Sequence, residues 1–269
     1  MASEKSVTSN GVTISYLDGG SGEPAFLLLP GWCDNRTVFD SLAPLLERRN
    51  RVLRPDWRGH GKSEKPREDF GSEDLLKDTL RVIEESGADL IIPVSMAHAG
   101  WIAIELHRRL GPKRVPKLVL LDWIVLDPPR EFLDVIHAML ENEESYTHVR
   151  EKLFESWNAG SSNSVVKDHI SKEMGAYGFD MWSRACREIS KSYSREGSPL
   201  SALSSLDHPP SVLHIYSQPL DPEWFAAQTE FSSRNPWFKV EKISEAKTHL
   251  IPLEAPEAIA SVISNFQAD

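Results

Sequence analysis

The chain has 269 residues, of which 40% are hydrophobic and 26% charged, and its mean hydropathy is -0.35. This composition is typical of one water-soluble globular domain and argues against disorder. A net charge of -10 and a pI near 5.4 argue against nucleic acid or an anionic membrane as partner, because both attract basic surfaces. A small-molecule ligand fits this charge better.

The two cysteines, Cys33 and Cys186, form neither a CxxC pair nor a cluster with histidines. The sequence therefore predicts no disulfide framework and no metal site. The first residues have no apolar stretch like that of a signal peptide, and no run approaches the ~18 apolar residues needed to span a bilayer. We expect a cytoplasmic monomer or homodimer.

Short apolar runs alternate with longer helical patterns, which is typical of a mostly parallel sheet with helices on both faces. The predicted strands are residues 12–16, 25–29, 51–54, 90–94, 117–121, 212–216 and 239–243, and the predicted helices are residues 38–47, 72–85, 98–110 and 256–267. Residues 127–201 have a helical pattern without a convincing strand. This indicates a helical cap insertion within one domain, residues 1–269, rather than a second domain.

Ligands of open α/β sheets bind beyond the carboxyl ends of the strands, so the residues after each strand are the first candidates for a site. Leu29, Pro30, Gly31 and Trp32 end one strand and could direct backbone N–H groups into a cleft. A plain Pro-Gly turn is the alternative.

The segment VSMAHAG at residues 94–100 leads from a strand into a helix, as the nucleophile elbow of the α/β-hydrolase fold does. Ser95 and Ala99 are small enough for that tight turn. Ala97 stands at the nucleophile position and has no atom that could accept an acyl group, which excludes a covalent mechanism through this residue. Ser95 is a possible shifted nucleophile, but its place in the elbow favours a packing role.

His249 follows the last predicted strand, where this fold carries its catalytic histidine. An imidazole suits a general base at neutral pH. Asp122, at the end of the run LLD, could orient it, and Asp221 after the next strand is a competitor that we favour less. His98, beside the elbow, is placed to line the same cleft.

Two further groups of residues have less specific signals. The segment DWRGHGKS at residues 56–63 resembles a turn common in α/β-hydrolases, and its Arg58 and His60 are expected to hold loops together. Trp157 and Trp182, in or near the insertion, could form a flat aromatic slot, although single tryptophans are as often part of a core.

Taken together, LLLPGWC, DWRGHGKS, PVSMAHAGW, LLDW, and the late PWF with KTHL resemble the cofactor-independent 2,4-dioxygenases of 3-hydroxy-4-oxoquinolines and quinaldines. These enzymes have the α/β-hydrolase fold, and the resemblance covers nearly the whole chain. LLLPGWC and the PVSxxHxGW elbow are its most specific parts.

The resemblance implies a base that deprotonates the 3-hydroxyl of a heteroaromatic substrate, whose anion then reacts directly with O2. Carbon monoxide and an N-acylanthranilate are released without metal or flavin. By position, His249 is the base and Asp122 its partner. Backbone donors at Trp32 and His98, beside Ala97, hold the substrate, and Trp157 lines its ring slot.

The chain departs from the family pattern at two positions. Family members usually carry serine where this chain has Ala97, and histidine where it has Asp34. That serine is thought to hydrogen-bond the substrate rather than attack it, so its loss need not abolish activity. The role of Asp34 is open.

Two other functions are compatible with the scaffold. One is another α/β-hydrolase activity, such as ester hydrolysis or a lyase reaction, and turnover of a chromogenic acetate that depends on Ser95 would favour it. The other is a small-molecule receptor that has lost its nucleophile, and tight quinolone binding without oxygen consumption would favour that.

Overall fold

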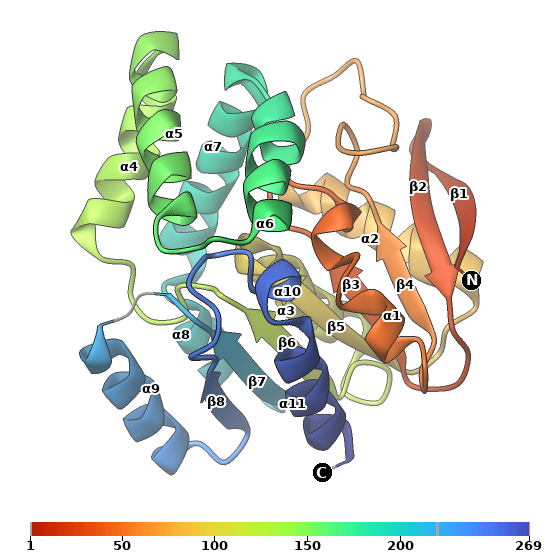
Figure 1. Cartoon of the computed structure of the whole chain (residues 1–269). Coiled ribbons are helices and arrows are strands. Elements are labelled where there is room, and N and C mark those ends of the chain that lie inside the picture. Colours follow the sequence, from red (N-terminus) through yellow and green to blue (C-terminus); the bar gives the residue numbers. More distant parts are fainter. Residues whose placement is uncertain (1, 219–220, 269) are drawn as a thin grey trace.

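The structure is a computed structural model that describes residues 2–218 and 221–268. Its centre is an eight-stranded sheet in the order β1-β2-β4-β3-β5-β6-β7-β8 (Figure 1). β1 and β2 pair antiparallel with each other, β2 pairs antiparallel with β4, and every other ladder is parallel. The strands are β1 (Ser3–Ser9), β2 (Val12–Gly19), β3 (Ala25–Leu29), β4 (Val52–Pro55), β5 (Ile91–Met96), β6 (Lys117–Leu121), β7 (Ser211–Tyr216) and β8 (Phe238–Lys242).

Helices cover both faces of this sheet, which confirms the predicted fold class. One group, α2, α3 and α8, is linked by mutual contacts, and a second group joins α1, α10 and α11. α9 packs on β8. The bounds are α1 (Ala43–Leu46), α2 (Ser72–Ser86), α3 (Gly100–Leu110), α8 (Pro199–Ser204), α9 (Pro222–Arg234), α10 (Ile251–Glu254) and α11 (Pro256–Ala268).

Between β6 and β7 the chain forms the insertion, which contains α4 to α7 and ends at the start of α8. Figure 1 shows α4 to α7 gathered at one end of the sheet. The backbone N–H of Leu200 donates to the carbonyl of Val125 at 3.1 Å, so the two ends of the insertion are joined where they meet the sheet. The remaining bounds are α4 (Arg130–Glu141), α5 (Glu143–Asn158), α6 (Ser164–Asp168), a π-helical turn (His169–Glu173), a 3-10 turn (Met174–Ala176) and α7 (Phe179–Glu196).

The predicted helix at residues 38–47 is wrong, because the chain forms a 3-10 turn (Arg36–Phe39) and then the short α1. Pro44 accounts for this difference. It lies in the first turn of α1, where its missing N–H is harmless, whereas one continuous helix would set its ring against the carbonyl of Asp40. The predicted helix at 98–110 begins as a 3-10 turn (Ala97–Ala99), and α3 proper starts at Gly100.

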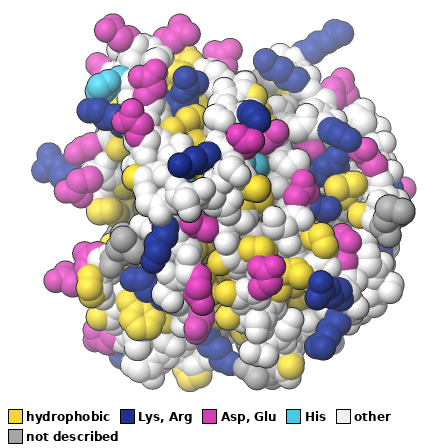
Figure 2. All heavy atoms as spheres, viewed as in Figure 1, with side chains coloured by type: hydrophobic (Ala, Val, Ile, Leu, Met, Phe, Trp, Pro, Cys, Tyr) yellow, Lys and Arg dark blue, Asp and Glu magenta, His cyan; other side chains and the backbone are white. Residues whose placement is uncertain are grey.

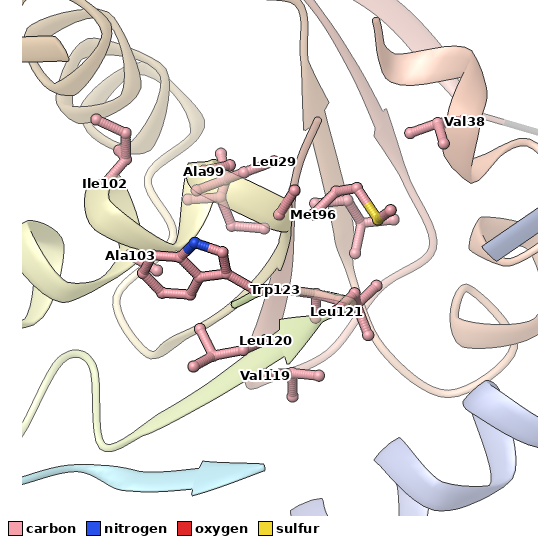
Figure 3. Packing of buried hydrophobic residues seen from close by; sticks show 14 of the residues in the cluster. Leu29, Val38, Met96, Ala99, Ile102, Ala103, Val119, Leu120, Leu121 and Trp123 are labelled. Atoms are coloured by element: carbon pink, nitrogen blue, oxygen red, sulfur yellow. The ribbon is translucent and has the colours of Figure 1, made fainter. Parts of the chain in front are cut away.

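The elbow is packed tightly against β6 and the residue after Asp122. A Cβ atom on Gly100 would lie 2.2 Å from the ring of Trp123, so only glycine allows this approach of α3. Figure 3 shows the Trp123 indole beside Ala103 of α3, among the buried side chains of β6. This packing fixes where β5 and β6 deliver their last residues.

The distribution of charged side chains on the surface and the character of the helices agree with the composition of the sequence. Acidic and basic side chains are interspersed over the face that Figure 2 shows. Within residues 2–218 and 221–268, no helix combines the length and the apolar character needed to cross a membrane.

Candidate active site

A cavity of about 460 Å³ lies between the carboxyl ends of the central strands and the insertion. Its sheet side is formed by residues after β3, β5 and β6 and by the loop before α10. Its other side is mostly apolar and comes from the insertion. All seven residues predicted for the site line this one cavity: Trp32, Ala97, His98, Asp122, Trp157, Trp182 and His249.

His249 and Asp122 form a hydrogen-bonded pair. Nδ1 of His249 donates to Oδ2 of Asp122 at 2.7 Å, while Oδ1 of Asp122 accepts from the backbone N–H groups of Ser217 at 2.7 Å and Gln218 at 3.0 Å. The Asp122 side chain is only 2% exposed. Because a carboxylate can only accept, the neutral imidazole carries its hydrogen on Nδ1 and presents Nε2 as the acceptor. This is the tautomer that a general base requires.

Ala97 has the backbone of a nucleophile elbow without its nucleophile. Its φ of 46° is in the left-handed region, which costs an L-residue other than glycine roughly 1–2 kcal/mol. The methyl side chain lines the cavity but offers no polar atom. His98 follows in the first turn of a helix, where backbone N–H groups have no intrahelical acceptor.

The His98 ring is held in one tautomer by the residue that follows Asp122. Nε1 of Trp123 donates to Nδ1 of His98 at 3.1 Å, so the neutral ring carries its hydrogen on Nε2. Desolvation by burial, and then the charge of nearby His249, lower the pKa of His98 to about 3. His98 is therefore neutral at physiological pH.

The aromatic residues of the insertion meet the dyad directly. The ring of Trp157 stacks on His249 with centroids 5.0 Å apart and planes 23° apart. Phe154 stacks on Trp157 and meets Trp182 edge-on, so the two tryptophans are linked through Phe154. The faces of Trp157 and Trp182 therefore do not form one simple slot, although both line the cavity.

Trp32 lies in the turn after β3 and packs into the loops beside the cavity. Its ring stacks on Phe70 and meets the edge of His60. His60 accepts from the backbone N–H of Cys33 at 3.2 Å, and burial lowers its pKa to about 4. Arg58 binds Asp78 through two hydrogen bonds. His60 thus connects two loops, Arg58 connects its loop to α2, and neither residue lines the cavity.

The competing residues lie elsewhere. Asp221 accepts from the backbone N–H of Glu223 at 2.9 Å and caps α9, away from His249. Ser95 is fully buried, and its hydroxyl donates to the carbonyl of Val119 at 3.3 Å. Neither residue lines the cavity, so Asp122 is the acid at the histidine and Ser95 has a packing role.

Sequence reasoning missed a second histidine–aspartate pair. Nε2 of His169 donates to Oδ1 of Asp34 at 2.6 Å, with side chains only 5% and 2% exposed. Asp34 lines the cavity, and His169 comes from the π-helical turn of the insertion. The position of Asp34 after the PGWC motif pointed to it, whereas nothing in the sequence around His169 marks that residue.

The comparisons with known proteins place this geometry in a class. A family model described as the alpha/beta hydrolase fold matches residues 24–267. The strand order, the elbow at Ala97 and the histidine after β8 are those that this fold uses.

Close relatives narrow the class. The chain is 36% identical to the 2-heptyl-3-hydroxy-4(1H)-quinolone dioxygenase of Mycobacteroides abscessus, over 94% of both chains. It is 35% identical to the 1H-3-hydroxy-4-oxoquinoline 2,4-dioxygenase of Pseudomonas putida, over 97% of this chain and 98% of the relative. A solved structure of an AqdC variant with its substrate, the Pseudomonas quinolone signal, superposes with a TM-score of 0.93 at 34% identity, over 99% of both chains. The chain belongs to the family of 3-hydroxy-4-quinolone dioxygenases, and the resemblance seen in its motifs is confirmed.

Proposed function

We propose that this protein cleaves the ring of a 3-hydroxy-4(1H)-quinolone with O2, without a cofactor, and releases carbon monoxide and an N-acylanthranilate. Membership of the dioxygenase family supplies the reaction class. The observation that supports the proposal most strongly is the His249–Asp122 pair, which presents an open Nε2 acceptor to an apolar cavity beside an elbow without a nucleophile.

The first step is a proton transfer from substrate to enzyme. Nε2 of His249 takes the proton of the 3-hydroxyl group, and Asp122 stabilises the imidazolium that results. Trp157, stacked on the imidazole, adds a favourable interaction between its ring face and the new cation. Backbone N–H groups of Trp32 and His98 stabilise the charge on the substrate oxygens.

The second step joins the substrate anion to O2. The anion is electron-rich and supplies the electrons that reduce oxygen, and a bicyclic peroxide forms across carbons 2 and 4 of the ring. Its collapse breaks both ring bonds to carbon 3, expels that carbon as carbon monoxide, and leaves both oxygen atoms of O2 in the N-acylanthranilate. The proton held by His249 passes to the departing product. Exclusion of water by the insertion protects the anion during these steps.

We propose the insertion as the cap of a single domain, whose packing against the sheet sets the depth of the cavity. Trp157 and Trp182 would then each line part of the space taken by the heteroaromatic ring, with Ala97 beside it. The acidic net charge argues against nucleic-acid and anionic-membrane partners, and we propose a cytoplasmic protein that acts as a monomer or homodimer.

Incubation with a 3-hydroxy-4(1H)-quinolone under air tests the function. We expect loss of the quinolone absorbance together with release of one equivalent of carbon monoxide. The His249→Ala variant should bind substrate but release carbon monoxide at a rate lower by at least about 100-fold. Carbon monoxide no higher than in that control would reject the proposal.

An esterase function has no support from the geometry. Ala97 cannot form an acyl intermediate, and the hydroxyl of Ser95 is sealed against β6. Measurement of oxygen consumption distinguishes a receptor function from the proposed one, because a receptor would bind the quinolone without consuming oxygen.

A further inference from the structure

Asp34 places a second carboxylate, besides Asp122, in the wall of a mostly apolar cavity. Its side chain is 2% exposed, and its Oδ1 atom is fully used. Oδ1 accepts from the backbone N–H of Asn35 at 2.7 Å and from Nε2 of His169 at 2.6 Å. A buried carboxylate with this much support is held in one orientation.

The other oxygen of Asp34 is left for a ligand. Among residues 2–218 and 221–268, no donor contacts Oδ2 of Asp34, and the side chain lines the cavity. Oδ2 is open to the cavity, and a ligand that displaces water there leaves this carboxylate oxygen without a partner unless the ligand supplies a donor. Oδ2 therefore calls for a donor from the bound molecule.

The acceptor atoms of the His249–Asp122 pair are already committed. Both oxygens of Asp122 are taken by His249 and two backbone N–H groups. Nε2 of His249 accepts the hydroxyl proton in the proposed reaction. A 3-hydroxy-4(1H)-quinolone has a second donor, the N–H of its ring, and this group also loses water on entering the cavity.

We propose that Oδ2 of Asp34 accepts the ring N–H of the substrate and that His169, a positioning residue, orients Asp34 from the insertion. The inference rests on the proposed function, because it assigns the substrate of that site. It makes Asp34 a specificity-determining residue. Heteroaromatic rings that carry an N–H group at ring position 1 are bound. Rings with an oxygen atom at position 1 set a lone pair against the Asp34 carboxylate and are rejected.

The test compares two ligands of nearly equal shape. Dissociation constants are measured without oxygen for 3-hydroxy-4(1H)-quinolone and for 3-hydroxychromone, which has a ring oxygen in place of the N–H. In the unmodified protein the quinolone should bind more tightly. In the variant Asp34→Asn, the ratio of the dissociation constant of the chromone to that of the quinolone should fall at least about tenfold. The two donors at Oδ1 hold the amide oxygen in place, so the amide NH2 group replaces Oδ2.

A neighbouring variant serves as the control. Glu173 accepts from Nδ2 of Asn35 at 2.7 Å, so it links the same loop to the insertion without lining the cavity. Glu173→Gln should weaken both ligands equally and leave their ratio within about twofold. An unchanged ratio in Asp34→Asn, or an equal narrowing in Glu173→Gln, would overturn the inference.

A measurement on the unmodified protein covers the case in which Asp34→Asn does not fold. The N–H proton of ¹⁵N-labelled quinolone, bound without oxygen, should resonate downfield of its free value because it donates to a carboxylate. An unshifted resonance would overturn the inference.

Oxygen admitted to the same samples separates the two proposals. If the quinolone is consumed and Asp34→Asn leaves the ratio of the two dissociation constants unchanged, the role of Asp34 is rejected but ring cleavage is not. Binding with a narrowed ratio but without consumption rejects ring cleavage and supports Asp34 as a recognition residue. Absence of quinolone binding rejects both.

Discussion

Asp122 determines which nitrogen of His249 can accept a proton. In Asp122→Asn, the amide oxygen will take the place of Oδ1, because Ser217 and Gln218 both donate there. The amide NH2 group then faces Nδ1 of His249, which must accept and so moves its hydrogen to Nε2. We expect kcat to fall at least about 100-fold, because the base presents the wrong tautomer.

Anaerobic binding of the quinolone separates this effect from a loss of structure. The dissociation constant of the quinolone for Asp122→Asn should rise less than about tenfold, because the Asp122 carboxylate makes no hydrogen bond to the substrate. A kcat within threefold of the unmodified protein would show that Asp122 does not fix the base.

Ala97 provides a second prediction for a single residue, this time of stability. Its φ of 46° suits glycine and is poor for a β-branched side chain. Ala97→Val should lower the free energy of unfolding by about 2 kcal/mol, which corresponds to a fall of several degrees in Tm. Ala97→Gly should be close to neutral, because relief of strain offsets the loss of a buried methyl group. Equal Tm values for the two variants would contradict a strained elbow.

The π-helical turn of the insertion is tied to the sheet through His169 and Asp34. Burial lowers the pKa of His169, but the hydrogen bond to Asp34 and the charges of Asp34, Glu173 and Asp40 raise it, with a net rise above the ordinary value. Its contribution to stability is thus complete below the unfolded pKa, about 6.5, and is lost as the pH rises through the folded pKa.

The variant His169→Gln tests this tie, because glutamine does not titrate. We expect it to lower the free energy of unfolding by about 2 kcal/mol at pH 6 and by clearly less at pH 9, measured by urea denaturation. His148→Gln, a change at an exposed residue of α5, is the matched control and should show no such trend. A loss for His169→Gln that is the same at both pH values would contradict the assignment.

Elements with a strong apolar pattern were predictable, and elements without one were not. β1 has a single apolar residue, Val7, and lies at the edge of the sheet with mostly exposed side chains. The turn at Asn10 and Gly11, both with positive φ, was the available signal for its hairpin with β2. In α9 the buried residue is the polar Gln228 and the partly buried Phe231 packs on Phe238, so its apolar pattern is too weak to mark it.

Part of the site follows from chain order, and part depends on packing across the cavity. His249 and Asp122 are placed by the ends of parallel strands, a rule that holds without knowing the helices. The stacking of Trp157 on His249 depends on how α5 crosses the cavity. The His169–Asp34 pair joins residues 135 positions apart, and no local pattern connects them.

At the scale of the whole molecule, the net charge of -10 distinguishes substrate from product. The neutral quinolone is indifferent to this charge, whereas an N-acylanthranilate carries a carboxylate and is repelled. Salt screens that repulsion. Between about 0.02 and 0.5 M sodium chloride, the inhibition constant of the product should fall roughly two- to threefold, while KM for the quinolone stays constant. A product inhibition constant independent of salt would contradict this expectation.

The hydrogen bond between Leu200 and Val125 closes the insertion at its base. Asp122 precedes this junction and His249 follows it, so neither residue of the dyad belongs to the segment that it encloses. Helices can be lengthened, shortened or exchanged above the junction at little entropic cost, since the two ends are already together. The insertion is therefore a module whose helices evolution can vary to admit new ring substituents, as long as Trp157 keeps its stack on His249 and His169 its hydrogen bond to Asp34.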